Sequence, residues 1–119
     1  EFHRVVRPGG AVWITVPFTW PLHEQPHDYY RYTKFGLRSL LERAGFSQVD
    51  VVPLTDAFST LSQLVHDLEF LMGKADDGYN EHRGLIGDTM RHISGLIASF
   101  SSFDAQWMLP IGYAATAVR

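Results

Sequence analysis

The run from Ala11 to Pro17 constrains the fold of this chain more than any other stretch. It is nearly all apolar and rich in β-branched residues, which is typical of a strand buried on both faces, as in a parallel sheet. Pro17 ends the run, because a proline inside a central strand would lose a ladder hydrogen bond. We therefore predict a central strand here, with Trp13 in the core.

Helical and strand-like patterns alternate along the rest of the chain. A short helical stripe opens the sequence, and the turn formers Pro8-Gly9-Gly10 end it. Thr33 is a good N-cap residue, and Gly45 is typical of the position that follows a helix. We predict helices over residues 1–6, 33–44, 56–74 and 81–103, a break over residues 73–80, and strands over residues 46–54 and 107–118, the last at a sheet edge.

Length and composition indicate one small domain. The chain has 119 residues, of which 45% are hydrophobic, enough for a modest core. A net charge of -3, with scattered lysines and arginines, argues against nucleic acid as a partner. The absence of cysteine is compatible with a reducing cytoplasm, and no apolar run reaches the roughly 18 residues that a membrane span needs. We expect a cytoplasmic protein with no membrane span.

Residues 21–33 concentrate the chemistry of the chain. They read Pro-Leu-His-Glu-Gln-Pro-His-Asp-Tyr-Tyr-Arg-Tyr-Thr, with two histidines, two carboxylates, an arginine and three tyrosines. The segment leaves the carboxyl end of the predicted central strand, which is the edge of an open α/β sheet where ligands bind. It is therefore the candidate functional site.

Part of this segment also matches a zinc-protease pattern, His-Glu-x-x-His, over residues 23–27. That pattern requires a continuous helix, in which Pro26 would remove a backbone donor and clash with the preceding turn. A metallohydrolase is therefore the least favoured reading. A metal held in an extended loop by four side chains remains open; these are His23, Glu24, His27 and Asp28.

The order of these features resembles the C-terminal half of class I S-adenosylmethionine-dependent methyltransferases. Residues 5–10, Val-Val-Arg-Pro-Gly-Gly, match the turn before that family's fifth strand. Residues 23–33 resemble the signature His-Glu-x-Pro-His-Asp-Tyr-x-Arg-Tyr-Thr of one bacterial subgroup. The resemblance implies the C-terminal part of a Rossmann-like α/β sheet over residues 1–55 and 104–119, interrupted by a helical hairpin at 56–103. It also implies an antiparallel pair of residues 47–54 with 111–119.

The family's cofactor motifs are missing from this chain. The resemblance implies S-adenosylmethionine as cofactor, bound by a glycine-rich turn after the first strand and an acidic residue ending the second. Neither is present, and Gly9-Gly10 precedes a strand instead of joining strand to helix. We therefore expect cofactor binding by the intact protein only, this chain being a fragment or a remnant.

The resemblance gives residues 20–32 an acceptor-side role. Methyl transfer needs aligned reactants, with a base where the acceptor is a hydroxyl, and His23 or His27 is the candidate catalytic base. The candidate acceptor-binding residues are Trp20, Asp28, Tyr29, Tyr30, Arg31 and Tyr32, with Arg31 able to clamp an anionic group. The alternative is structural: Asp28 and Arg31 pair to fix the loop, while Tyr30 and Tyr32 pack on the next helix. The acceptor is expected to be a small molecule or a glycan.

A non-catalytic module that keeps this fold and assembles through its long helices is the alternative function. A partial sheet would leave an apolar edge and faces exposed, and pairing with a second copy would cover them. We therefore expect a homo-oligomer, a dimer or larger.

Overall fold

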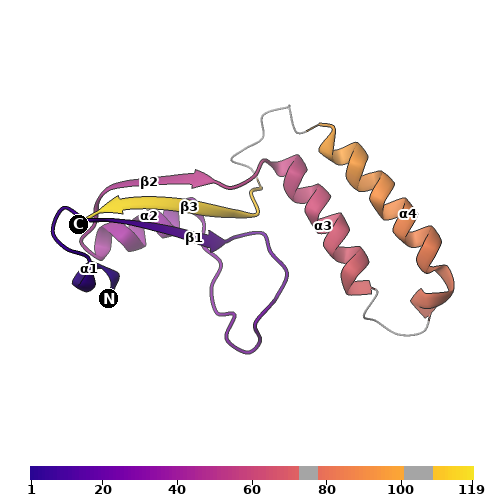
Figure 1. Ribbon diagram of the computed structural model, residues 1–119, viewed down its shortest axis with the longest axis horizontal. Helices are drawn as coiled ribbons and strands as arrows, with labels where there is room; N and C mark the ends of the chain where they lie inside the picture. Colours follow the sequence, from indigo (N-terminus) through magenta and orange to yellow (C-terminus); the bar gives the residue numbers. More distant parts are fainter. Residues whose placement is uncertain (73–77, 101–108) are drawn as a thin grey trace. The chain divides into compact units, whose positions relative to one another are not determined.

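The computed structural model describes residues 1–72, 78–100 and 109–119 and has a mixed α/β fold (Figure 1). The chain divides into two compact units. We call residues 1–55 with 110–119 the sheet unit, and residues 56–109 the hairpin unit.

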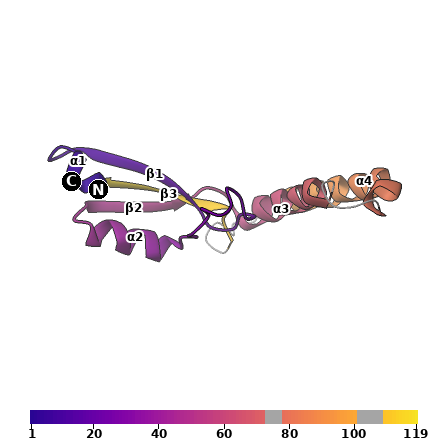
Figure 2. The same ribbon diagram turned by 90° about the horizontal axis from the view of Figure 1, so that it is seen from below.

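The sheet unit contains three strands, β1 (Ala11–Pro17), β2 (Ser47–Pro53) and β3 (Gly112–Val118), in the order β1-β3-β2. Both pairings are antiparallel, so β1 and β2 run parallel to each other on either side of β3. Helix α2 (Lys34–Arg43) connects β1 to β2, and Figure 2 shows it beside the sheet. The expected antiparallel pairing of residues 47–54 with 111–119 is confirmed.

Three predictions about the sheet are wrong. The last strand, β3, lies between its neighbours instead of at an edge, and β1 takes an edge. Small residues suit β3 to the inner position, because Ala115 and Ala117 are almost fully buried there. Trp13 is 74% exposed rather than in the core, because side chains alternate across a strand and Trp13 faces away from the core.

The core of the sheet unit lies between α2 and one face of the sheet. Its buried members are Leu37, Leu41, Phe46, Val49, Val51, Tyr113, Ala115 and Ala117, with Val12, Ile14, Val16, Phe18 and Tyr32 packed against them. On α2 only Leu37 and Leu41 are buried, whereas Phe35 is 72% exposed. The apolar surface of α2 is therefore wider than the part that the sheet covers.

The predicted ends of α2 are confirmed. The Thr33 hydroxyl accepts a hydrogen bond from the Gly36 backbone N–H at 3.1 Å. Gly45 follows the helix with φ +96°, a conformation that favours glycine. The short helix α1 (Phe2–Val5) precedes β1, and the turn between them places Gly9 at φ +74°.

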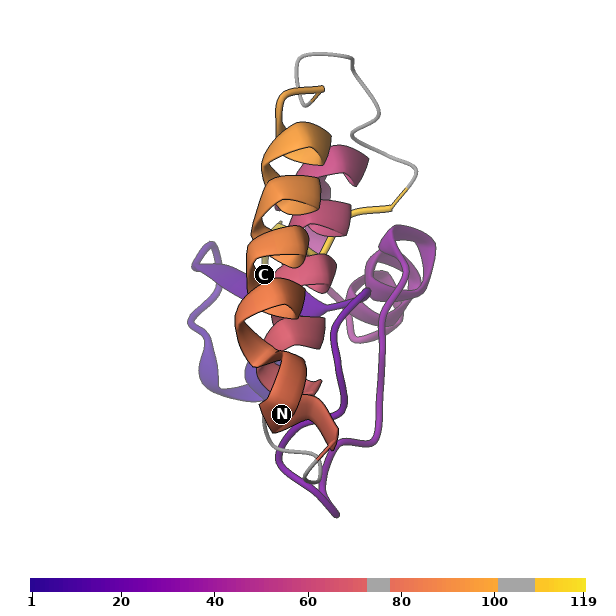
Figure 3. The same cartoon turned by 90° about the vertical axis from the view of Figure 1, so that its right-hand side faces the viewer.

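The hairpin unit contains helices α3 (Ala57–Met72) and α4 (Gly78–Ala98), which pack side by side (Figure 3). Asp56 caps α3, because its carboxylate accepts the N–H groups of Phe58 and Ser59, both at 2.9 Å. The two helices are linked by a hydrogen bond between the hydroxyl oxygens of Ser62 and Ser94, which lie 2.5 Å apart. Among the described helices, none is long and apolar enough to cross a membrane.

The predicted boundaries of these elements differ from the observed ones. Helix α4 begins at Gly78, so the predicted break over residues 73–80 is wrong for its last three positions, which are helical. The helix ends at Ala98 instead of residue 103, and β3 begins at Gly112 instead of residue 107. Residues 73–77 and 101–108, on which parts of these predictions fall, lie outside the described residues.

Candidate functional site

The segment between β1 and α2 starts and ends beside the same strand terminus. At its start, the N–H groups of Phe18 and Thr19 donate to the Ile111 carbonyl at 3.0 and 3.1 Å. At its end, the Tyr32 N–H donates to the Pro17 carbonyl at 3.2 Å. Residues 18–33, which we call the site loop, are therefore held at the carboxyl end of β1.

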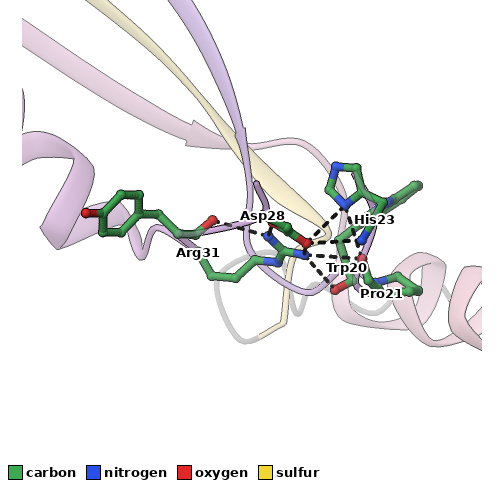
Figure 4. A network of polar contacts seen from close by, with 6 residues as sticks. Trp20, Pro21, His23, Asp28 and Arg31 are labelled. Carbon is green, nitrogen blue, oxygen red and sulfur yellow. Dashed lines mark hydrogen bonds and ion pairs between the residues drawn. The ribbon is translucent and has the colours of Figure 1, made fainter. Parts of the chain in front are cut away.

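An ion pair between Asp28 and Arg31 organises the interior of the site loop (Figure 4). Arg31 Nη2 donates to Asp28 Oδ2 at 2.6 Å, and Arg31 Nη1 donates to the other carboxylate oxygen. The same guanidinium donates to three backbone carbonyls, those of Trp20 (3.4 Å), Pro21 (3.2 Å) and Tyr30 (3.2 Å). These bonds tie the two arms of the loop together, and we call this network the clamp.

Asp28 is held in its charged form by these contacts. Its side chain is only 8% exposed. The Arg31 guanidinium, followed by the His23 backbone N–H at 3.1 Å, lowers the pKa of the Asp28 carboxyl from 3.8 to about 2. The expected structural alternative, in which Asp28 and Arg31 pair to fix the loop, therefore describes the observed contacts.

The two candidate bases are oriented by contacts within the loop. His23 Nδ1 lies 3.2 Å from the Pro21 carbonyl oxygen and 3.4 Å from Asp28 Oδ2. His27 Nδ1 lies 3.0 Å from the Tyr29 hydroxyl. In both rings these contacts engage Nδ1, so Nε2 is the nitrogen that remains for an external partner.

Residues 23–27 do not form the helix that the zinc-protease pattern requires. They make a turn in which the His27 N–H donates to the Glu24 carbonyl at 2.9 Å. Glu24 has φ +52°, and the Gln25–Pro26 peptide bond is cis. Within the described ranges, no three histidine or acidic side chains gather in a way that could hold a metal ion.

Aromatic rings follow one another along the second arm of the site loop. The ring of His27 lies 6.0 Å from that of Tyr29, Tyr29 lies 6.4 Å from Tyr30, and Tyr30 lies 5.9 Å from Tyr32, between centroids. Tyr29 and Tyr30 are 68% and 69% exposed, whereas Tyr32 packs against the core. The structural alternative placed Tyr30 and Tyr32 against the next helix; Tyr32 packs against the core that includes Leu37 and Leu41 of α2, whereas Tyr30 is exposed.

A small recess opens at the carboxyl end of β1. It has a volume of about 190 Å³ and is lined by Thr15, Val16, Pro17, Trp20, Leu54, Ile111 and Gly112. Trp20 is the candidate site residue that lines it. Leu54 and Ile111 were not predicted as site residues, because only the pairing of distant strands brings them beside Trp20.

A larger cavity, of about 350 Å³, lies between α1, β1 and α2. Its lining is mostly apolar and includes Phe2, Ile14, Leu37 and Phe46. Tyr32 is the candidate residue that reaches it. The predicted site residues therefore divide between the clamp (Asp28, Arg31), the exposed rings (Tyr29, Tyr30), the two imidazoles and the walls of two hollows (Trp20, Tyr32).

Comparison with known proteins finds one similar solved structure and no match among family models or curated proteins. Among solved structures, the chain is similar to phospholethanolamine N-methyltransferase 2 of Haemonchus contortus, in a complex with phosphomonomethylethanolamine and S-adenosylhomocysteine. The match has a TM-score of 0.43 and 18% identity and covers 99% of this chain. This chain spans about 28% of the length of that protein.

Proposed function

We propose that this chain forms the acceptor-side part of an S-adenosylmethionine-dependent methyltransferase. The sequence resemblance over residues 5–10 and 23–33 supports the class. One structural observation carries the proposal further: the clamp of Asp28 and Arg31 holds the site loop at the carboxyl end of β1, where α/β sheets bind ligands. The helical hairpin would then be an insertion between β2 and β3.

In this proposal the residues of the site loop have three different roles. His23 or His27 would accept a proton from the acceptor through Nε2, because an imidazole is the side chain that most often serves as a general base. Trp20, Tyr29 and Tyr30 would contact the acceptor, with Tyr32 behind them. Asp28 and Arg31 would position these groups rather than touch the acceptor.

The residues of this chain do not fit the cofactor as its main binding site. Gly9 and Gly10 lie at the amino end of β1, opposite the site loop. Their backbone N–H groups are already bonded, Gly9 to the Arg119 carbonyl at 2.8 Å and Gly10 to the Arg7 carbonyl at 2.8 Å. S-adenosylmethionine would therefore be bound mainly by residues outside this chain.

Methyl incorporation by histidine variants tests the proposed role of the loop. The product of the complete reading frame would be incubated with labelled S-adenosylmethionine and a small-molecule extract of the source cells. Loss of a general base typically costs about 100-fold or more, so we expect that drop in the double variant His23→Ala, His27→Ala. His92→Ala, on exposed α4, is the matched control. Unchanged incorporation by the double variant would contradict the assignment.

A second candidate function is supported by the hairpin unit. Helix α3 exposes Leu61 and Leu68, and α4 exposes Leu85, Ile93 and Leu96, at 39% to 71% of their surfaces. Exposed apolar groups at helical spacing favour contact with another helix, so we propose assembly of two chains through these faces. Light scattering should then give a dimer mass, and Leu96→Glu should give a monomer, while His92→Glu should not. A monomeric unmodified chain would exclude this candidate.

A further inference from the structure

We infer that the site loop binds an uncharged sugar through its exposed aromatic rings. This inference rests on the proposed function, because it names the class of acceptor for the same loop. Three observations support it: Arg31 is paired with Asp28, the rings of Tyr29 and Tyr30 are exposed, and the recess beside Trp20 is small.

The cations near the site loop are already engaged. Within the described part of the chain, the Arg31 guanidinium donates its hydrogen bonds to Asp28 and to backbone carbonyls of the loop. Lys34, at the start of α2, lies with its ammonium group 4.9 Å from the centre of the Phe35 ring. A phosphate or carboxylate on the acceptor would therefore compete with Asp28 and the loop carbonyls for the Arg31 guanidinium. This charge distribution disfavours an anionic acceptor.

The exposed surface of the loop is aromatic and carries hydroxyl groups. Tyr29 and Tyr30 expose more than two thirds of their surfaces, and Trp20 exposes 41%. Each tyrosine offers a flat apolar ring and a hydroxyl that can donate or accept a hydrogen bond. A sugar offers the complementary surface, with a face of C–H groups and a rim of hydroxyls. Tyrosine also loses little conformational entropy when it binds, since it has only two side-chain torsions.

The recess beside Trp20 is a small, open hollow. Its volume of about 190 Å³ is below the roughly 300 Å³ at which pockets for drug-sized molecules begin. Its walls are mainly apolar, from Pro17, Leu54 and Ile111. A single sugar ring is therefore a better match than a fused ring system or a folded chain.

The histidines fit the same class of acceptor. A sugar hydroxyl is a weak nucleophile and needs a base to take its proton. The Nδ1 contacts of His23 and His27 leave Nε2 as the position for such an acceptor. Of the two carboxylates of the loop, Asp28 is held by Arg31 and Glu24 is exposed, so the choline probe below tests a positively charged acceptor directly.

Saturation-transfer NMR on the 119-residue chain tests the inference directly. The probes are methyl α- and β-glucosides, galactosides and mannosides, with glucose 1-phosphate and choline as charged comparisons. We expect saturation of sugar ring protons by at least one neutral glycoside and weaker signals from both charged probes. Removing a stacking ring typically costs about 1 kcal/mol, so Tyr29→Ala and Tyr30→Ala should each weaken the signal about fivefold. Leu22→Ala, 72% exposed in the same loop, should leave it unchanged.

Several results would overturn the inference. These are no transfer to any neutral glycoside, stronger transfer to glucose 1-phosphate or choline, or equal losses in the Leu22 and tyrosine variants. The tyrosines are mostly exposed, so their variants should fold, which amide spectra would verify. The result is independent of the methyltransferase assignment, because binding of S-adenosylmethionine to the complete protein is measured separately and can succeed where the sugar fails.

Discussion

At the scale of single residues, the site loop depends on one carboxylate. Asp28 accepts hydrogen bonds from the Arg31 guanidinium and the His23 backbone, and these lower its pKa to about 2. A carboxyl whose folded pKa lies below its ordinary value stabilises the folded state above the ordinary value, and that contribution is lost as pH falls toward the folded pKa. The loop should therefore be ordered at neutral pH and loosen in acid.

Acidification should release the clamp between about pH 4 and pH 2, since the ordinary pKa is 3.8 and the folded pKa is about 2. The carboxyl carbon shift of Asp28, followed by NMR, should give a midpoint near 2 and change together with the His23 amide shift. In Asp28→Asn the His23 shift should no longer follow this transition. A midpoint near 3.8 in the unmodified chain would contradict the clamp.

At the scale of elements, local hydrogen bonds define where the helices begin. Thr33 accepts from Gly36 at the start of α2, and Asp56 accepts from Phe58 and Ser59 at the start of α3. Bonds from the Ser59 hydroxyl and N–H, together with the Phe58 N–H, lower the pKa of the Asp56 carboxyl. Asp56 is therefore charged at neutral pH and suited to a helix start.

Removing either cap should weaken its helix. Thr33→Ala and Asp56→Ala should each lower the free energy of unfolding by about 1 kcal/mol, because a helix N–H loses its partner. Urea denaturation followed by circular dichroism measures the change. Thr116→Ala, on an exposed position of β3, is the control and should have a smaller effect. No loss in either cap variant would show that the caps do not stabilise the helices.

The central position of β3 gives a sharper prediction about the sheet. Ala117 is fully buried and lies opposite Val12 of β1 in the ladder. Ala117→Leu should overpack the core and lower the free energy of unfolding by about 1–3 kcal/mol. Thr116→Leu, one residue away on the opposite face, should have little effect in the same urea titration. An unchanged free energy of unfolding for Ala117→Leu would contradict the burial of Ala117 between the sheet and α2.

Local signals in the sequence were sufficient for the limits of α2 and not for the order of the strands. The N-cap Thr33 and the glycine at position 45 act through neighbouring residues, so the limits of α2 could be predicted. Strand order depends on pairing between distant residues, so the inner position of β3 could not be predicted. Because nearly all residues of β1 are apolar, the sequence did not indicate which of its side chains face the core and which, like Trp13, are exposed.

The same difference between local and distant contacts applies to the candidate site. Asp28 and Arg31 are three residues apart, and their pairing was foreseen as an alternative to acceptor binding. The recess lined by Trp20, Leu54 and Ile111 joins three distant segments, so no local pattern indicated it. The exposure of Tyr30 also depends on which side of the loop faces the core.

At the scale of the whole molecule, a sheet unit carries the site loop and a hairpin unit follows β2. The two segments of the sheet unit, residues 1–55 and 110–119, are joined near their ends by a hydrogen bond. The Ile111 N–H donates to the Thr55 hydroxyl at 2.9 Å. The site loop and its clamp lie entirely within the sheet unit. The chemistry that we propose would therefore use the site loop of the sheet unit.

Calorimetric titration with S-adenosylmethionine tests this account most directly, using the 119-residue chain and the product of the complete reading frame side by side. We predict micromolar binding by the complete product and no binding by the 119-residue chain, whose sequence lacks the glycine-rich turn and the acidic strand end. Micromolar binding by the 119-residue chain would contradict the proposed division of the site. No binding by the complete product would contradict the methyltransferase assignment itself.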